Sequence, residues 1–229
     1  TDCVIIGNSK KVILTKNGLK YHLNNSLNDL PGNKWSYFLR SVINTRFSTK
    51  GEEGYAHNIR KIHPSPKPPQ LMRVIIEFFT KENEYIFDFF MGVGGTLLAA
   101  SLCNRKALGI DLSQKYISTY KKASKFLNLS EQECIKGNSI EILEEENLIK
   151  KFLGNKKFSL IALDPPYGDM MSREKTGEAI KKNLSTEATP FTKKKTDLGN
   201  LNWNDFLIQF SKSINLSMKF LKENGHIVV

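Results

Sequence analysis

Four short apolar runs in the middle of the chain constrain its fold more than any other feature. They span residues 84–90, 106–111, 134–136 and 158–163, and each ends at or just before a glycine or an aspartate. Runs of this length between turn residues indicate buried strands, and a helical pattern follows each of the first three. Because strands that alternate with helices pair in parallel, the sequence predicts an α/β fold with a doubly wound, mostly parallel sheet.

Helical patterns surround these runs. They cover residues 74–80, 97–104, 114–127, 140–152 and 204–221. Ser113 is a suitable N-cap for the third helix, and the prolines among residues 63–69 suit the entrance of the first, which should begin at residue 70 or 71. The last helix carries one apolar stripe, which predicts core packing for Phe206, Phe210, Ile214 and Met218. A fifth strand is expected at residues 226–229.

Two regions flank this α/β unit. Residues 1–59 are predicted to form a basic N-terminal extension, with a β-hairpin at residues 4–6 and 11–14 and an amphipathic helix near residues 34–44. Residues 60–229 are expected to form the main domain, in which residues 169–200 are a polar, basic loop. The chain begins without Met and ends inside a predicted strand, so we expect this domain to be incomplete at its C-terminus.

The charge of the chain is unevenly distributed. Residues 1–83 hold 13 basic and 6 acidic side chains, residues 84–168 hold 11 and 10, and residues 169–229 hold 10 and 7. A neutral centre between basic flanks favours an anionic polymer as partner, because Lys and Arg side chains that neutralise phosphates release counterions. A solvated surface rich in lysine is the alternative explanation of the same charge.

Several classes of protein are disfavoured. The three cysteines, Cys3, Cys103 and Cys134, are far apart and form no CxxC pair, so neither a disulfide framework nor a zinc site is indicated. No apolar run approaches the roughly 20 residues of a membrane span, and the first residues lack the pattern of a secretory signal. A cytoplasmic protein with no membrane partner is therefore expected.

A glycine turn follows the first apolar run. Gly92, Gly94 and Gly95 precede Thr96, but the third glycine of a dinucleotide-binding fingerprint and the GK[ST] of a P-loop are absent. Asp111, at the end of the next strand, is placed where one carboxylate can accept hydrogen bonds from both ribose hydroxyls of a nucleoside. The turn by itself is equally compatible with tight packing of a strand against a helix.

The most specific motif is Asp164-Pro165-Pro166-Tyr167, directly after the last buried run. The two prolines fix the backbone at the carboxyl end of a strand, where α/β sheets bind ligands. The Asp164 carboxylate and the Pro165 carbonyl are two acceptors beside an aromatic ring, a combination that suits an exocyclic amino group on a stacked base. The alternative is a rigid turn with a solvent-facing Asp and a core Tyr.

The chain resembles the S-adenosylmethionine-dependent DNA amino-methyltransferases, which modify adenine-N6 or cytosine-N4. Residues 164–167 look like the family's DPPY, residues 88–96 are similar to its DxFxGxGxT cofactor loop, and residues 63–68 match its HPxxKP segment. The order of the three motifs resembles the family's gamma arrangement, in which target recognition follows the catalytic half. The resemblance implies a Rossmann-like class I methyltransferase fold. Phe89 and Asn138 depart from the family, which usually has Pro and often Asp at these places.

The resemblance also implies roles for individual residues. Catalysis falls to Asp164, Pro165, Pro166 and Tyr167. The cofactor S-adenosylmethionine, with S-adenosylhomocysteine as product, is expected to be bound by Lys67, Asp88, Phe90, Gly92, Gly94, Thr96, Asp111 and Asn138. No metal is needed. We further expect the basic loop, through Lys193, Lys194 and Lys195, to contact nucleic-acid phosphates.

The implied reaction is site-specific methylation of the N6 amino group of an adenine flipped out of double-stranded DNA. The protein is accordingly expected in the cytoplasm, associated with the nucleoid. A restriction nuclease or a further subunit is a conceivable partner. RNA is an alternative substrate, since tRNA guanine-N2 methyltransferases carry a DPPYG-like turn and Gly168 follows Tyr167 here. Cytosine-N4 is disfavoured because that activity more often has Ser at the place of Asp164. A methyltransferase-like subunit that only binds nucleic acid is the alternative without enzymatic activity.

Overall fold

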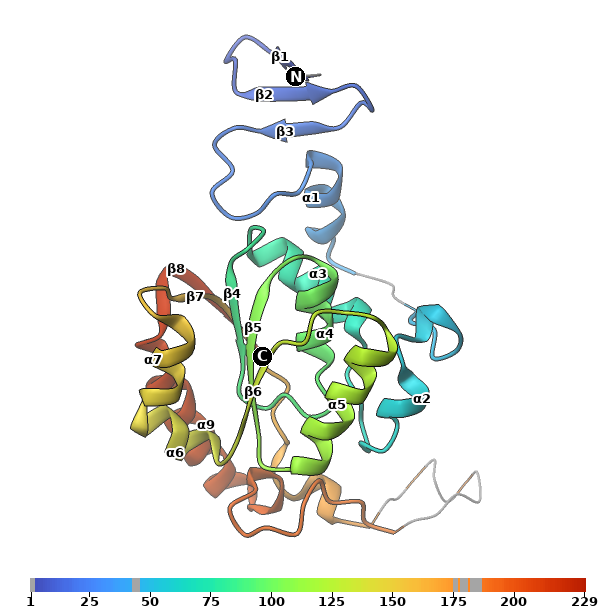
Figure 1. Ribbon diagram of the computed structural model, residues 1–229, viewed down its shortest axis with the longest axis vertical. Helices are drawn as coiled ribbons and strands as arrows, with labels where there is room; N and C mark the ends of the chain where they lie inside the picture. Colours follow the sequence, from blue (N-terminus) through green and yellow to red (C-terminus); the bar gives the residue numbers. More distant parts are fainter. Residues whose placement is uncertain (1–2, 43–45, 175–176, 178–180, 182–186) are drawn as a thin grey trace.

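The computed structural model describes residues 3–42, 46–174, 177, 181 and 187–229. Within these residues the chain forms two separate sheets (Figure 1). The first is a small antiparallel sheet made of β1 (Cys3–Ile6), β2 (Val12–Thr15) and β3 (Lys20–His22). The second has five strands, in the order β6-β5-β4-β7-β8, and carries the larger part of the core.

The five-stranded sheet is parallel throughout. Its strands are β4 (Tyr85–Asp88), β5 (Lys106–Asp111), β6 (Glu133–Lys136), β7 (Phe158–Ala162) and β8 (Leu221–Val228), and every neighbouring pair is parallel. The chain moves outward from β4 to β5 and β6, then crosses back to β7 on the other side of β4. This reversal creates a crevice at the carboxyl ends of β4 and β7, where doubly wound sheets bind ligands. The predicted doubly wound parallel sheet is confirmed.

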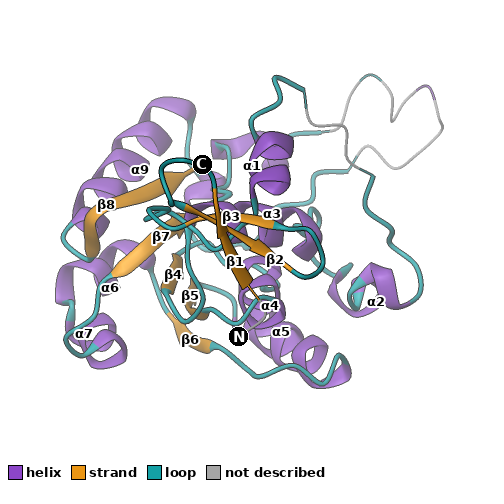
Figure 2. Ribbon diagram, turned by 90° about the horizontal axis from the view of Figure 1, so that it is seen from above, coloured by secondary structure: helices purple, strands orange, loops and turns teal. Residues whose placement is uncertain are grey.

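Helices cover both faces of this sheet, as Figure 2 shows. One face is covered by α3 (Pro69–Phe79), α4 (Gly95–Leu102) and α5 (Gln114–Phe126), and the other by α6 (Ser139–Glu145), α7 (Asn147–Leu153) and α9 (Trp203–Met218). Two apolar clusters fill the layers between helices and sheet. Fully buried β7 reads as a continuous apolar run because it has a helix layer on each side.

The structure differs from the sequence predictions at three helices. The expected helix at residues 140–152 is two helices, because Glu146 adopts a left-handed backbone with φ of 61°. In the predicted core stripe of α9, Phe206 is buried, but Met218 at the last turn is 56% exposed. The N-terminal helix α1 (Gly32–Phe38) is shorter than predicted, and residues 43–44 of that prediction lie outside the described residues.

The N-terminal sheet lies at the end of the molecule opposite the carboxyl ends of the parallel strands (Figure 1). Buried Asn28 donates a hydrogen bond of 2.6 Å to the carbonyl of Phe78, at the end of α3. Trp35 and Phe38 pack on the Phe78 ring, with centroids 4.9 Å and 3.7 Å away. The predicted hairpin is confirmed as β1 and β2, while the domain boundary at residue 59 stays a prediction.

Short elements connect these parts. They are η1 (Glu52–Gly54) and α2 (His57–Arg60) before α3, and η2 (Gly168–Ser172) and η3 (Leu198–Asn200) between β7 and α9. Among the described helices, none combines the length and the apolar character that crossing a bilayer requires.

Candidate active site

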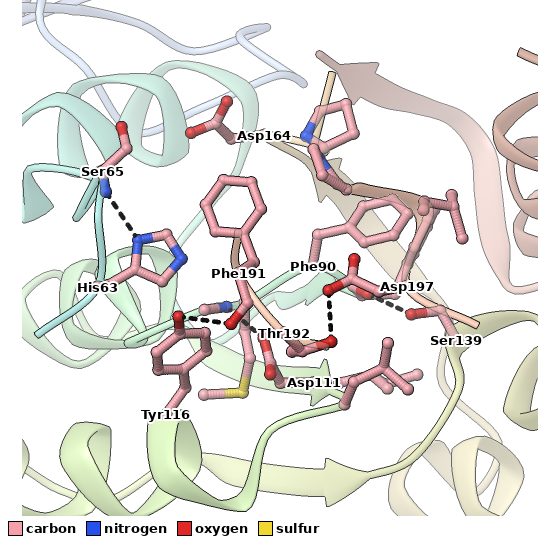
Figure 3. A pocket seen from close by; sticks show the side chains of 18 of the residues that line it. His63, Ser65, Phe90, Asp111, Tyr116, Ser139, Asp164, Phe191, Thr192 and Asp197 are labelled. Carbon is pink, nitrogen blue, oxygen red and sulfur yellow. Dashed lines mark hydrogen bonds between the residues drawn. The ribbon is translucent and has the colours of Figure 1, made fainter. Parts of the chain in front are cut away.

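One cavity opens at the carboxyl ends of the parallel strands, and most of the predicted site residues line it (Figure 3). Its walls come from the turns after β4, β5, β6 and β7, together with the proline-rich segment before α3. The predicted residues that line it are Lys67, Phe90, Gly92, Asp111, Asn138, Asp164, Pro165, Pro166 and Tyr167. The fold thus brings the glycine turn and the Asp-Pro-Pro-Tyr motif to one space, although about 70 residues separate them in the sequence.

Asp88, Gly94 and Thr96 lie behind the cavity wall rather than in it. The fully buried Asp88 carboxylate accepts hydrogen bonds from the Phe90 backbone N–H, at 3.0 Å, and from the Thr96 hydroxyl. These contacts hold the turn that follows β4 in shape. The structure therefore places the three residues as supports of the turn.

Two glycines let the turn pack closely. Gly94 has φ of 73°, and a Cβ atom there would lie 2.2 Å from the Tyr120 ring. A Cβ atom on Gly95 would lie 2.6 Å from the Lys67 carbonyl oxygen. Glycine suits both positions, because it accepts the left-handed backbone at residue 94 and leaves room for the Lys67 backbone at residue 95.

The Lys67 ammonium is a nearly buried cation at one side of the cavity. Its Nζ atom lies 3.5 Å from Asp88 Oδ2, its side chain is 12% exposed, and it makes no hydrogen bond to any described residue. The Lys67 carbonyl accepts a hydrogen bond of 2.8 Å from the guanidinium of Arg60. Burial lowers the pKa of Arg60 to about 10. A buried ammonium with free donors suits an anionic group of a ligand.

The Asp111 carboxylate is part of the cavity wall. It accepts hydrogen bonds from the backbone N–H groups of Gly92, at 2.9 Å, and Ser113, at 2.7 Å. Burial raises the pKa of Asp111 to about 7, and the nearby Asp197 and Asp88 carboxylates act in the same direction. The two backbone donors fix the carboxylate and leave acceptor capacity toward the cavity.

His63 enters the cavity as a neutral ring. Burial lowers its pKa to about 4, and its Nδ1 atom accepts a hydrogen bond of 3.2 Å from the Ser65 N–H. The proton of the neutral ring is therefore on Nε2, the ring atom that would lie 3.2 Å from a Cβ atom on Gly92. The His63 ring stacks on the Phe191 ring, with 5.1 Å between ring centroids, and makes an edge contact with the Tyr116 ring, with 4.7 Å between centroids.

The Asp-Pro-Pro-Tyr turn forms the other side of the cavity. The Tyr167 hydroxyl donates to Asp164 Oδ1 at 3.3 Å, and half of the Tyr167 side chain is exposed. Partial burial and the Asp164 carboxylate both raise the pKa of the Tyr167 phenol. Tyr167 is thus not a core residue, and its ring can stack on a ligand beside an exposed carboxylate.

Sequence reasoning missed part of the site. The predicted polar loop returns to the cavity, which Phe191, Thr192, Asp197 and Leu198 help to line. The only local signal was the pair of apolar residues, Phe191 and Leu198, in an otherwise polar stretch.

The three lysines predicted to contact nucleic acid belong to this returning segment, residues 191–198. Lys193, Lys194 and Lys195 are exposed and do not line the cavity. Lys194 donates a hydrogen bond of 3.0 Å to the Leu112 carbonyl. Residues 175–176, 178–180 and 182–186 of the predicted basic loop lie outside the described residues. In the part of the chain that the structure describes, no group of three or more His, Cys, Asp and Glu side chains could hold a metal ion.

Sequence comparison with known proteins finds similarity to methyltransferases. A family model described as DNA methylase matches residues 8–122, just over half of the chain. The tRNA (guanine(10)-N2)-dimethyltransferase of Methanocaldococcus jannaschii is 30% identical over 156 residues, which are 66% of this chain and 42% of that protein. The type II methyltransferase M2.LlaDCHI of Lactococcus lactis subsp. cremoris is 43% identical over 60 residues, which are 26% of this chain and 22% of that protein.

Among solved structures, NSun6 from Pyrococcus horikoshii with SFG has a TM-score of 0.47 and 17% identity, covering 71% of this chain and 36% of that chain. The chain spans less than half the length of the two curated relatives.

Proposed function

The chain belongs to the DNA methylase family whose model matches residues 8–122, and from this premise we propose that it methylates the exocyclic amino group of a nucleobase, with S-adenosylmethionine as methyl donor. One observation carries the proposal. The Asp-Pro-Pro-Tyr turn and the glycine turn with Asp111 line the same cavity, so a base and a nucleoside cofactor can meet there. Methyl transfer needs this proximity, because the accepting nitrogen must lie in line behind the methyl group.

The residues of the cavity fit S-adenosylmethionine. The Lys67 ammonium, with no hydrogen-bond partner among the described residues, suits the carboxylate of the methionine moiety. The Asp111 carboxylate suits the ribose hydroxyls, and Asn138 lies where the adenine ring would follow. When bound, the cofactor supplies a methyl group activated on a sulfonium.

The chain's own contribution is to orient the accepting base. We propose that the Asp164 carboxylate and the Pro165 carbonyl accept the two amino protons, which directs the nitrogen lone pair toward the methyl group. Asp164 would stabilise the positive charge that develops on this nitrogen as the methyl group passes to it from sulfur and S-adenosylhomocysteine is released. One amino proton would pass to the Asp164 carboxylate and from this exposed side chain to water. The Tyr167 ring stacks on the base, which must leave a duplex to reach the cavity.

Adenine-N6 in double-stranded DNA is the target that we propose. The DNA methylase family model and the HPxxKP segment, which places His63 and Lys67 in the cavity, support it. Guanine-N2 in tRNA is the second candidate, because the 30% identity to the archaeal tRNA enzyme extends over 156 residues. Cytosine-N4 is the third.

The test is direct identification of the product. The protein is incubated with S-adenosylmethionine labelled in the methyl group and with either DNA or tRNA, and the nucleosides are separated after digestion. Label in N6-methyl-2′-deoxyadenosine from DNA supports the proposal, whereas label in N2-methylguanosine from tRNA replaces it with the second candidate. Asp164→Ala should abolish transfer and keep S-adenosylhomocysteine binding, with the exposed Asp205→Ala as matched control. An active Asp164→Ala variant refutes the catalytic assignment.

We also propose that the three consecutive lysines at residues 193–195 contact phosphates. Neutralising Lys193 and Lys195 should reduce the slope of log binding constant against log salt by about one for each lost contact. Lys194 is left in place because it holds the Leu112 carbonyl. The exposed Lys121, whose Nζ lies 2.7 Å from Glu131 on the α5 side, is the control. A slope that does not change refutes the phosphate contacts.

A further inference from the structure

The returning segment after residue 187 places a carboxylate in the cavity, Asp197, that the proposed reaction does not use. Its side chain lines the cavity and the residue is 5% exposed. The next residue, Leu198, packs with Ile140 and Phe206 in a small apolar cluster, which anchors the segment against the start of α6 and α9. Asp197 is therefore a buried acceptor held beside the turn that follows β6.

Hydrogen bonds fix the position of Asp197. Its Oδ2 atom accepts from the Thr192 hydroxyl at 2.7 Å and its Oδ1 atom from the Gly199 N–H at 2.9 Å (Figure 3 shows the first). The segment is held further by Tyr116, whose hydroxyl donates to the Phe191 carbonyl at 3.0 Å. Each carboxylate oxygen thus has one protein donor and retains a lone pair for a ligand.

The chemistry of a nucleoside cofactor decides which part of it reaches Asp197. The sulfonium is attached to C5′ of the ribose and must face Asp164, where the methyl group is transferred. The adenine is attached to C1′, on the other side of the ribose that Asp111 would hold. The adenine must therefore lie beyond the ribose, away from the methyl group, and the lining residues that follow β5 and β6, Leu112 and Asn138, are there to receive it together with Leu198.

That part of the cavity needs an acceptor for the adenine amino group, and Asn138 supplies only one neutral amide oxygen, which keeps a single lone pair for a ligand. Its Oδ1 atom already accepts from the Ile140 N–H at 2.9 Å as the N-cap of α6, and its other polar side-chain atom is a donor. Asp197 brings a full carboxylate to the same region from a different part of the chain. An ionised acceptor makes the stronger hydrogen bond.

We propose that Asp197 accepts a hydrogen bond from the exocyclic amino group of the cofactor's adenine and thereby selects an adenosyl cofactor over an inosyl one. This inference rests on the proposed function, since it assumes that S-adenosylmethionine binds in this cavity. Under this proposal, residues 191–198 recognise the cofactor through Asp197, in addition to the phosphate contacts proposed for the lysines of the same segment.

The test compares two ligands that differ at this group. Calorimetry measures the binding of S-adenosylhomocysteine and of S-inosylhomocysteine, whose carbonyl replaces the amino group, to the natural chain and to Asp197→Asn. The natural chain should prefer the adenosyl ligand by about 100-fold, because the inosyl carbonyl would face an unpaired carboxylate. Asp197→Asn should lose most of this preference or reverse it, because an amide N–H can donate to the inosyl carbonyl.

The asparagine variant preserves the local structure, since its amide can still accept from the Gly199 N–H and donate to the Thr192 hydroxyl. Thermal unfolding verifies its fold, and Asp205→Asn, an exposed carboxylate at the start of α9, is the matched control. Equal weakening of both ligands in Asp197→Asn, or an unchanged preference, overturns the inference and leaves the proposed function standing. If the natural chain binds neither ligand, the proposed function itself fails, and the inference fails with it.

Discussion

Removing the charge of Asp88 should destabilise the fold strongly, although Asp88 does not line the cavity. In Asp88→Asn the amide oxygen can still accept from the Phe90 N–H, while the amide nitrogen replaces Oδ2, the atom that accepts from the Thr96 hydroxyl and faces Lys67 Nζ at 3.5 Å. At this distance the attraction is about 5 kcal/mol with an effective dielectric constant of about 20. Removing one partner of a buried pair typically costs about 3–5 kcal/mol, because the other charge stays buried.

A double-mutant cycle measures this interaction. Urea unfolding followed by circular dichroism gives the free energy of unfolding for the natural chain, Asp88→Asn, Lys67→Met and the double variant. We expect Asp88→Asn to lower the free energy of unfolding by about 3–5 kcal/mol, a large part of the 5–15 kcal/mol that is typical of a domain. The double variant should cost less than the sum of the single ones by about 2–3 kcal/mol.

The exposed pair of Lys121 and Glu131, at 2.7 Å with both side chains about half exposed, is the control. Its coupling energy should be below about 1 kcal/mol, since water and salt screen it. If the Lys67 and Asp88 pair shows no more coupling than this control, or if the single effects simply add, the assignment of Asp88 as the buried counter-ion of Lys67 is wrong.

Three further predictions concern the glycine turn, the Asp111 carboxylate and the N-terminal sheet. Gly94→Ala should cost about 2–4 kcal/mol in urea unfolding, from a left-handed backbone and a clash with Tyr120, and a cost below 1 kcal/mol would contradict the turn geometry. Because the folded-state pKa of Asp111 is raised to about 7, its contribution to stability is complete below its ordinary pKa near 4 and is lost as the pH rises through 7. Binding of S-adenosylhomocysteine should depend on pH in the opposite direction. Its affinity, measured by calorimetry, should rise by up to about tenfold per pH unit below pH 7 and level off above pH 7, and Asp111→Asn should remove this dependence. An affinity that does not change with pH in the natural chain excludes an ionised Asp111 as the ribose acceptor. Asn28→Ala should cost about 1–3 kcal/mol by leaving the buried Phe78 carbonyl unpaired, and limited proteolysis should then cut the N-terminal sheet faster; unchanged cleavage would show that Asn28 does not anchor it.

Much of the parallel sheet could be predicted because its signals are local. The strand predicted at residues 106–111 matches β5 residue for residue, and Ser113 caps the helix that follows it, accepting from the Tyr116 N–H. Each of these features depends on neighbours in the sequence. The break at Glu146 escaped prediction because an acidic, helix-favouring residue gives no local sign of a left-handed backbone.

The site was predictable where short motifs carry its chemistry. The turns that contain Gly92 and Asp164 are recognisable in the sequence, and the structure places both in one cavity. The motif did not reveal that Asp88 lies buried behind the cavity wall, where it faces Lys67, because the position of a side chain depends on the packing around it. Within the proposed cofactor set, the structure therefore separates residues of the cavity wall from residues that support it.

The sequence by itself determined the strands β4 to β7, their turns, the parallel architecture and the family to which the chain belongs, whereas β8 begins at Leu221, before the strand expected at residues 226–229. Periodicity, prolines and glycines act over a few residues, so a linear pattern encodes them. Only the tertiary structure decided that residues 191–198 fold back onto the cavity and bring Asp197 into its wall, and that the basic N-terminal sheet lies at the far end of the molecule. These contacts join distant parts of the chain through apolar packing and isolated hydrogen bonds, for which no local pattern exists.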